Sequence, residues 1–270
     1  MIWRIFRNGA IASAIAGILY GLVLLYDIAM RDPRVFDGWI MFSAIAFQMF
    51  FSWRRRLPKL PVGDVTSWMQ AHIYCGYVTV AFFAVHTQLT LPDSELEWAL
   101  WLLCIVVFIS GAFGAFLTRS VPAKLQAKTQ HVALENIPAL QAQLARQVDD
   151  LVIGSVGEIR ASALTGFYAQ TLHAFFRRPR NTLAHLKQSE RPLRIICDEL
   201  DSLDRYLDKP GKETLRSIKA CIVAKDGLDY QRAHQGLLVV WLFIHVPAAY
   251  ALVALSIVHV VIVYAYTSGA

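Results

Sequence analysis

Five apolar segments, each long enough to cross a bilayer, constrain this chain more than any other feature of its sequence. They cover about 9–28, 36–53, 67–91, 96–118 and 235–266. Because roughly 20 consecutive apolar residues form a helix that spans the hydrocarbon of a membrane, each segment predicts one transmembrane helix. The composition agrees, since 56% of the 270 residues are hydrophobic and only 17% are charged. We therefore expect an all-α integral membrane bundle with five transmembrane helices.

Most of the charge is concentrated between the fourth and fifth segments. The stretch 119–232 holds 18 of the 26 Lys and Arg residues and 13 of the 20 Asp and Glu residues. Leucines and valines recur at helical spacing after Pro138, and leucines and isoleucines after Pro192, which predicts a small helical domain. No dinucleotide fingerprint, P-loop or paired metal motif occurs in it, so we expect a docking function for this domain.

The loops between the segments predict the orientation of the chain. Arg4, Arg7, Lys59, Arg119 and the run 54–56 carry positive charge on one side of the predicted bundle, whereas the acidic loop 93–97 on the other side has no basic residue. Basic loops stay in the cytoplasm. We expect the bacterial inner membrane as the location, with the N-terminus and the 119–232 domain in the cytoplasm.

The predicted domains follow from these boundaries. Residues 1–118 hold transmembrane helices one to four, 119–232 form the inserted helical cytoplasmic domain, and 233–270 hold transmembrane helix five. The fifth segment has about 32 residues, or about 48 Å of helix, which exceeds the hydrocarbon thickness. We expect it to tilt, or to continue as one helix toward the 119–232 domain.

Four histidines inside these segments share one spacing. His72 and His86 lie in the third segment, His245 and His259 lie in the fifth, and each pair is fourteen positions apart. Fourteen positions return to nearly the same face of a helix, about 21 Å along its axis. Each of the two helices therefore presents two imidazoles on one face, at two depths.

The third and fifth segments run in the same direction in the predicted topology, so their histidines match by depth. His72 is expected to face His245, and His86 to face His259. Two neutral imidazoles on facing helices provide the axial ligands of a six-coordinate haem iron. The alternative is that the four histidines form ordinary interhelical hydrogen bonds or a proton path. Their repeated spacing, and the cost of ionisable groups at such depth, favour haem ligation.

Two small residues accompany the inner histidines. Gly76 and Ala249 each follow one of them by four positions and therefore lie one turn away on the same face. We expect both to let a porphyrin approach the helix backbone. The four cysteines form no C-x-x-C-H motif, so the sequence predicts two haem b groups that are bound non-covalently.

The H-x13-H pattern on two parallel helices resembles the di-haem four-helix core of cytochrome b from quinol-oxidising bc-type complexes. The resemblance covers the second to fifth segments and implies a low-potential and a high-potential haem b that pass electrons across the membrane. The proline-glutamate-tryptophan-tyrosine signature of that family's quinol-oxidation site is absent, and the predicted orientation is reversed. Bifurcated quinol oxidation is therefore not implied. Five helices with two b haems also resemble the membrane anchors of nitrate reductases and nickel-iron hydrogenases.

The leading hypothesis is a di-haem cytochrome b subunit, the electron-transfer part of an oxidoreductase complex, that connects the quinone pool with protein redox partners. A c-type cytochrome or an iron-sulfur protein is the expected kind of partner, besides membrane lipid and other subunits, and quinone is the expected small ligand. One alternative is a quinone-independent conduit to a c-type cytochrome or a metal ion, and another is a non-redox scaffold or ion transporter. The net charge of +6 follows from topology, and no nucleic-acid reader motif occurs.

Two further features leave alternatives open. His234 lies eleven positions before His245 and returns to nearly the same helix face, so it is either a haem propionate or quinone proton contact, or an interfacial polar residue. The arginine run 54–56 either pairs with haem propionates or reflects topology alone.

Overall fold

The computed structural model describes residues 2–29, 33–56, 64–128, 132–155 and 162–267 of the chain. It is all-α, 91% helical, and no strand occurs in these ranges, so the predicted all-α class is confirmed. Of the features used to predict orientation, Lys59 and the side chains of Arg4 and of the arginine run 54–56 lie outside the described residues.

Three helices are long and apolar enough to cross a membrane by their length and composition. Within the described ranges these spans are Phe6–Ile28, Glu95–Gln126 and Lys209–Tyr266. The predicted segments 36–53 and 67–91 also lie in helices, but these two do not meet the same criterion. The chain is therefore suited to association with a membrane through at least these three helices.

The chain divides into two compact units. Unit 1 consists of Met1–Phe116 together with Trp241–Ala270, and unit 2 consists of Leu117–Val240. Unit 1 contains the four histidines of the H-x13-H pairs, and unit 2 contains the whole charged stretch 119–232 that the sequence set apart.

Three helices of unit 1 begin or end where the local sequence requires it. Helix α1 covers Ile2–Ile28, α2 covers Pro33–Arg56 and α3 covers Val65–Thr87. Pro33 is the first residue of α2, where a missing N–H is tolerated. The Asp64 carboxylate accepts a hydrogen bond from the Ser67 backbone N–H at 3.2 Å and caps α3.

The third helix is shorter than predicted. We expected its segment to continue to residue 91, but it ends at Thr87. Gln88 and Leu89 adopt positive φ angles of 52° and 57°, and the Gln88 N–H bonds back to the Val85 carbonyl. This left-handed turn satisfies the last carbonyls of the helix and redirects the chain. Leu89 and Leu91 belong to the loop after the helix. Because both are apolar, the hydropathy pattern extended the predicted segment beyond the end of the helix.

Two helices are longer than the apolar segments that predicted them. Helix α4 covers Glu95–Lys128 and α10 covers Lys209–Thr267, which is 59 residues. Both continue through an internal proline, Pro122 in α4 and Pro247 in α10. Each helix contributes residues to both units.

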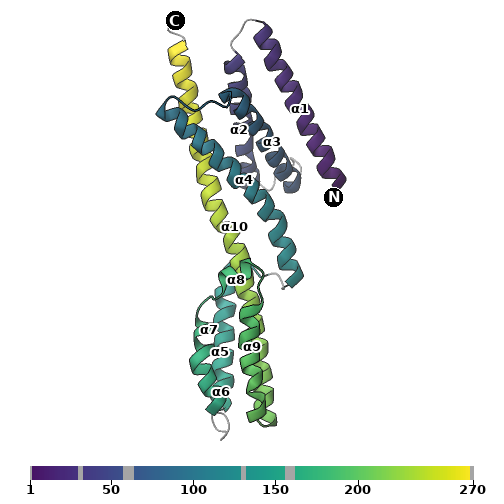
Figure 1. The fold of residues 1–270 in the computed structure, drawn as a ribbon, viewed down its shortest axis with the longest axis vertical. Coiled ribbons are helices and arrows are strands. Elements are labelled where there is room, and N and C mark those ends of the chain that lie inside the picture. Colours follow the sequence, from purple (N-terminus) through teal and green to yellow (C-terminus); the bar gives the residue numbers. More distant parts are fainter. Residues whose placement is uncertain (1, 30–32, 57–63, 129–131, 156–161, 268–270) are drawn as a thin grey trace. The chain divides into compact units, whose positions relative to one another are not determined.

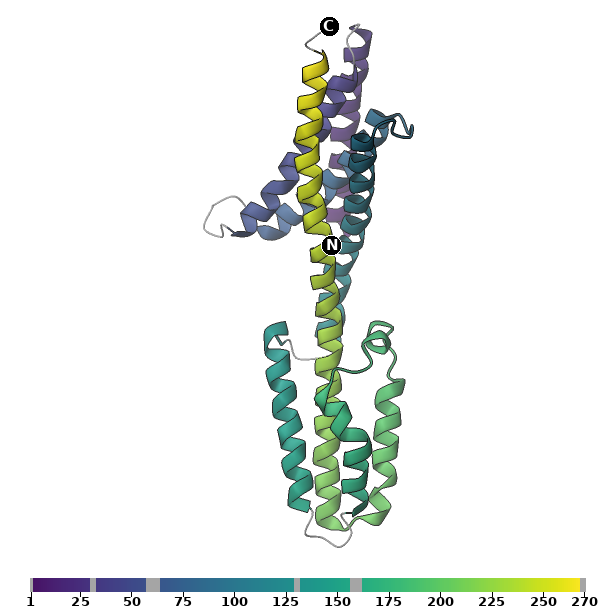
Figure 2. The ribbon, with the colours of Figure 1, turned by 90° about the vertical axis from the view of Figure 1, so that its left-hand side faces the viewer.

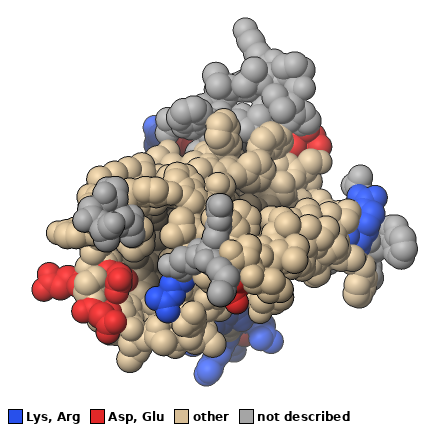
Figure 3. All heavy atoms as spheres, turned by 90° about the horizontal axis from the view of Figure 1, so that it is seen from above, with Lys and Arg blue, Asp and Glu red and all other residues tan. Residues whose placement is uncertain are grey.

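Within unit 1, α2 and α3 pack against each other most closely, and α1 packs on both of them (Figures 1 and 2). Large apolar side chains cover the outside of these helices, among them Ile18, Leu25, Ile109, Phe116 and Val261. An exterior of this kind is suited to lipid. Figure 3 shows one end of the chain, where charged side chains occur in a few separate groups among uncharged ones.

Unit 2 is a small helical bundle of the kind that the sequence predicted. Figures 1 and 2 show its longer helices lying along the first part of α10. Its elements before α10 are η1 (Leu134–Asn136), α5 (Ile137–Ser155), α6 (Ser162–Phe167), η2 (Tyr168–Leu172, a π-helical turn), α7 (His173–Arg177), α8 (Thr182–Leu186), α9 (Arg191–Ser202) and η3 (Asp204–Tyr206).

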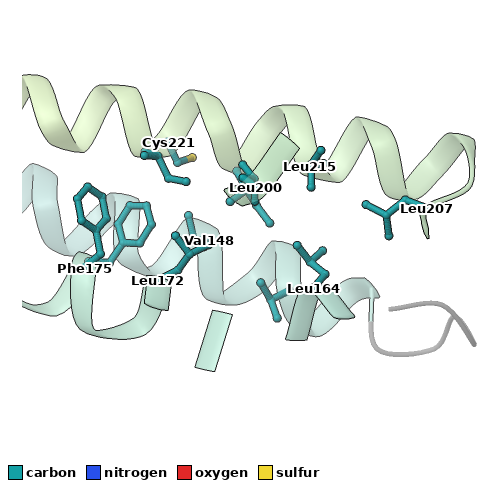
Figure 4. Close-up of a cluster of buried hydrophobic side chains, with 12 residues drawn as sticks. Val148, Leu164, Leu172, Phe175, Leu200, Leu207, Leu215 and Cys221 are labelled. Carbon is teal, nitrogen blue, oxygen red and sulfur yellow. The ribbon is translucent and has the colours of Figure 1, made fainter. Parts of the chain in front are cut away.

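The core of unit 2 joins all of its longer helices. Val148 of α5, Phe175 of α7, Leu200 of α9 and Ile222 of α10 are at most 1% exposed and belong to one cluster, drawn in Figure 4. Burying such side chains fully contributes roughly 1.5–3 kcal/mol each. Unit 2 thus has a hydrophobic core of its own.

A buried charge pair lies beside this core. The Lys225 ammonium is fully buried, contacts the Asp229 carboxylate at 2.5 Å, and donates to the Arg178 carbonyl at 3.0 Å. The Gln141 amide donates to the other oxygen of Asp229 at 2.7 Å. Because each buried charge has several partners, its desolvation cost is offset.

Candidate functional site

The inner pair of histidines lies side by side in unit 1. The ring centroids of His72 on α3 and His245 on α10 are 6.4 Å apart, and the ring planes are inclined at 78°. Phe51 of α2 lies against the His72 ring at 5.2 Å. The backbones of α3 and α10 approach each other less closely than those of α2 and α3. The two imidazole side chains extend toward each other between α3 and α10.

A serine on α4 holds the His245 imidazole. Ser110 Oγ lies 2.6 Å from the Val106 carbonyl and 2.9 Å from His245 Nδ1. In the tautomer with its proton on Nδ1, His245 donates to Ser110 Oγ while the hydroxyl donates to the carbonyl, and Nε2 is the unprotonated nitrogen. A neutral imidazole with one nitrogen held in this way has its other nitrogen oriented for a metal.

Two glycines let α4 approach this imidazole. A Cβ atom on Gly111 would lie 3.3 Å from His245 Cε1, and one on Gly114 would lie 2.0 Å from the Trp241 ring. Trp241 stacks on His245 with centroids 5.6 Å apart, and its Nε1–H donates to the Ser110 carbonyl at 2.7 Å. Helix α4 therefore fixes both the position and the hydrogen bond of His245.

The outer pair has a charged partner instead of a neutral one. The His86 Nδ1 atom of α3 lies 2.7 Å from the Asp37 carboxylate of α2, and Asp37 is only 2% exposed. A Cβ atom on Gly38 would lie 3.1 Å from His86 Cε1, so glycine is needed there too. His259 of α10 lies close enough to both His86 and Glu97 to interact with them electrostatically.

Apolar side chains separate the inner and outer levels. Ile45 of α2, Cys104 of α4 and Leu252 of α10 form a buried cluster, and Phe83 of α3 packs against it. Thr79, between the two histidines of α3, donates to the Cys75 carbonyl and accepts from Gln48 at 3.0 Å. The two imidazole pairs are therefore distinct sites with a mainly apolar region between them.

Gly76 and Ala249 are the two small residues that the sequence predicted to lie beside a porphyrin. A Cβ atom on Gly76 would lie 3.3 Å from the Gln48 amide oxygen, so this glycine lets the α2 side chain approach α3. Ala249 is half-buried one turn after His245 on α10. Ser256, one turn before His259, is buried.

The donor set fits an iron porphyrin. An imidazole nitrogen binds a transition metal at about 2 Å, so two imidazoles on opposite sides of one metal have ring centroids about 6 Å apart. The 6.4 Å separation of His72 and His245 agrees with that spacing. In addition, Nδ1 of His72 is buried without a hydrogen-bond partner among the described residues, and such a group calls for a ligand or rearrangement.

The same residues do not fit a metal ion held by protein alone. Among the described residues, no group of three or more His, Cys, Asp or Glu side chains could enclose an ion. A structural zinc site needs four protein ligands, and a catalytic one usually needs three. Haem iron needs only the two axial positions from the protein, which matches a paired arrangement.

Sequence reasoning singled out the four histidines but not their partners. Asp37 is a carboxylate near the start of an apolar segment, and this signal could have identified it, because charged groups at such positions are usually functional. Ser110 and Trp241 gave no comparable signal, since serine and tryptophan are common in membrane helices. Their role depends on how α4 is rotated against α10.

His234 belongs to unit 2, not to the unit that holds the histidine pairs. It is 2% exposed, its Nδ1 lies 3.0 Å from the Tyr230 carbonyl, and its ring lies 4.2 Å from the Tyr230 ring. In the structure its described contacts are therefore those of a packed polar residue.

Comparison of the chain with models of protein families, with curated proteins and with solved structures finds no match.

Proposed function

We propose that the chain is a di-haem cytochrome b subunit that carries electrons across the bacterial inner membrane, between the quinone pool and protein redox partners. The observation that carries this proposal is the adjacency of the His72 and His245 rings, which come from α3 and α10 and have centroids 6.4 Å apart. In this proposal, His72 with His245 and His86 with His259 are the axial ligands of two non-covalent b haems. Bound haem supplies a one-electron couple of iron.

The surroundings of the imidazoles support this assignment. Asp37 and Ser110 each engage Nδ1 of one histidine, which leaves Nε2 for iron and fixes the orientation of the ring. Carboxylate–histidine and hydroxyl–histidine contacts of this kind are common behind metal ligands. With two histidines to hold each iron, the sites would suit one-electron transfer and would leave no position at iron for a small molecule.

The proposal also includes a membrane topology. Helices α1, α2, α3, α4 and the last part of α10 cross the membrane in it, with the N-terminus and unit 2 in the cytoplasm. The asymmetry of the basic loops supports this orientation. Unit 2 has a core of its own and no visible nucleotide motif, so its proposed role is to dock a redox partner, with a c-type cytochrome or an iron-sulfur protein as the kind of partner expected in the complex.

The test is a dithionite-reduced minus oxidised spectrum of the purified full-length chain, with haem quantified as the pyridine haemochrome. Two haems b per chain are expected. His86→Ala and His259→Ala should each lose the same single haem, because each removes one ligand of the outer pair. His173→Ala, an exposed histidine of unit 2, is the matched control and should keep both haems.

A chain without haem, or with haem that is unaffected by both ligand substitutions, would contradict the proposal. The four histidines would then serve packing or ion transport. Two haems that no quinol analogue can reduce would instead favour the quinone-independent conduit.

A further inference from the structure

A large cavity lies within unit 1, on a side of α3 different from the face that carries the histidines. Its volume is about 1100 Å³, and helices α1, α2 and α3 form its walls. Typical small-molecule sites occupy about 300–1,000 Å³, so this cavity has room for a ring-sized group and part of a chain. The α3 residues that line it include Gln70, Ala71, Tyr74 and Val78, whereas His72 and Gly76 belong to the adjacent face.

One end of the cavity is polar. Arg7 and Asn8 of α1 meet the start of α3 there, and the Asn8 amide donates to the Gln70 amide oxygen at 2.9 Å. Asp64, at the same end, accepts from the Ser67 hydroxyl at 2.6 Å. Among the described residues at this end, the charges of Arg7 and Asp64 are opposite, so the two supply no net positive charge for a phosphate group. Its amide and hydroxyl groups suit an uncharged head group with carbonyl or hydroxyl oxygens.

The rest of the cavity is apolar and partly aromatic. Ile15 and Leu19 of α1 line it opposite Phe36 and Trp39 of α2. Ile15 and Leu19 come later in α1 than Arg7 and Asn8, and Phe36 and Trp39 lie in the first turns of α2, so the cavity extends along α1 and α2. A molecule with a polar ring and a hydrophobic tail matches this polarity.

The polar end lies at the depth of the inner imidazole pair. Gln70 and Ala71 directly precede His72 in α3, and at 1.5 Å per residue they lie about 3 Å or less from it along the helix axis. Helix α3 thus has the cavity on one face and the inner pair on the next. A redox-active occupant would be separated from the inner site by one helix.

We propose that this cavity binds a lipid-soluble quinone, with its oxygen-bearing ring at the Asn8–Gln70 end and its tail along α1 and α2. The proposal rests on the proposed function and adds a location for quinone exchange. A quinol oxidised there gives up two electrons and two protons. The two haems that the histidine pairs would hold would supply the one-electron acceptors for these two electrons, and the two protons would pass to water; reduction of a quinone has the reverse balance.

The test is photoaffinity labelling of the purified full-length chain with an azidoquinone, followed by mass-spectrometric mapping of the labelled peptides. Label is expected on α1, α2 or α3, and decylubiquinone should compete with it. Ala12→Phe fills the cavity and should lower labelling at least tenfold, since Ala12 lines it. Ala14→Phe is the matched control, because Ala14 is exposed on the same helix, and it should label like the unchanged chain.

Three outcomes would overturn the proposal. Label could map outside these helices, Ala12→Phe could label normally, or a phospholipid could compete as well as decylubiquinone does, which would identify a lipid site. Haem content, measured on the same samples, separates this proposal from the proposed function. If Ala12→Phe loses labelling but keeps both haems, quinone binds in the cavity. If the unchanged chain holds two haems but α1–α3 are not labelled, the cavity proposal fails and the proposed function stands.

Discussion

Asp37 lies beside the His86 imidazole, whereas the described hydrogen-bond partner of the inner pair is the neutral Ser110 hydroxyl. A carboxylate on the outer nitrogen makes the imidazole a more basic ligand, and its negative charge stabilises the oxidised iron. The outer site should therefore have the lower reduction potential. At the scale of single residues, the outer site differs from the inner one by two carboxylates, Asp37 beside His86 and Glu97 near His259.

Replacing Asp37 by asparagine should raise the reduction potential of the outer haem. An increase on the order of 60 mV corresponds to a tenfold change in a one-electron equilibrium. A spectroscopic potentiometric titration of the purified chain measures it. Asp93→Asn is the control, since Asp93 is an exposed carboxylate in the loop before α4, and it should leave both potentials unchanged. An equal shift of both haems in Asp37→Asn would contradict the argument.

The depth and face of the histidines were predicted from helix geometry, and their pairing was predicted from the parallel course of the third and fifth segments. His72 and His245 are indeed adjacent. The position of Ser110 against His245 could not be predicted in the same way, since it depends on the rotation of α4. That rotation is set by packing at Gly111 and Gly114, and such packing leaves no periodic signal in a segment that is apolar on all sides.

At the scale of helices, α4 and α10 pack through a contact that only glycine allows. Gly114→Ala should displace Trp241, because its Cβ would lie 2.0 Å from the indole ring. We expect loss or spectral perturbation of the inner haem and a destabilisation of roughly 1–3 kcal/mol, typical of overpacking. Haem content and thermal unfolding of the purified chain measure these effects.

The control for that substitution is Gly21→Ala in α1. No atom lies within 4 Å of a Cβ built on Gly21, so alanine fits there and favours the helix slightly. Equal behaviour of the two variants would mean that the close approach of α4 to Trp241 is not required.

The ends of helices were the least predictable elements. Apolar segments indicate where a helix contacts lipid, but α10 begins at Lys209, well before its apolar part, because its earlier residues pack in unit 2. Conversely, α3 ends at Thr87 inside an apolar pattern, since Gln88 adopts a left-handed conformation. Hydropathy therefore predicted the segments, and tertiary packing and capping determined their limits.

At the scale of the whole molecule, unit 2 has a weak point of its own. Asp229→Ala leaves the Lys225 ammonium buried without its carboxylate, which typically costs about 3–5 kcal/mol. Unit 2 should then be cleaved faster by protease in the full-length chain, while both haem bands persist at low temperature. Asp201→Asn is the control, because the Lys219–Asp201 pair is half-exposed, and such pairs contribute below about 1 kcal/mol. Equal protease sensitivity of the two variants would contradict this prediction.

The fourteen-position spacing of the histidines in each helix has an electrical consequence in the proposed function. It corresponds to about 21 Å of helix, against a hydrocarbon layer about 30 Å thick. An electron that passes between the two levels therefore crosses roughly two-thirds of the insulating layer. One charge crossing the whole layer exchanges about 2.3 kcal/mol per 100 mV, so each transfer exchanges about 1.5 kcal/mol per 100 mV. The distribution of electrons between the two haems would thus follow the voltage across the membrane, and every transfer would charge or discharge it.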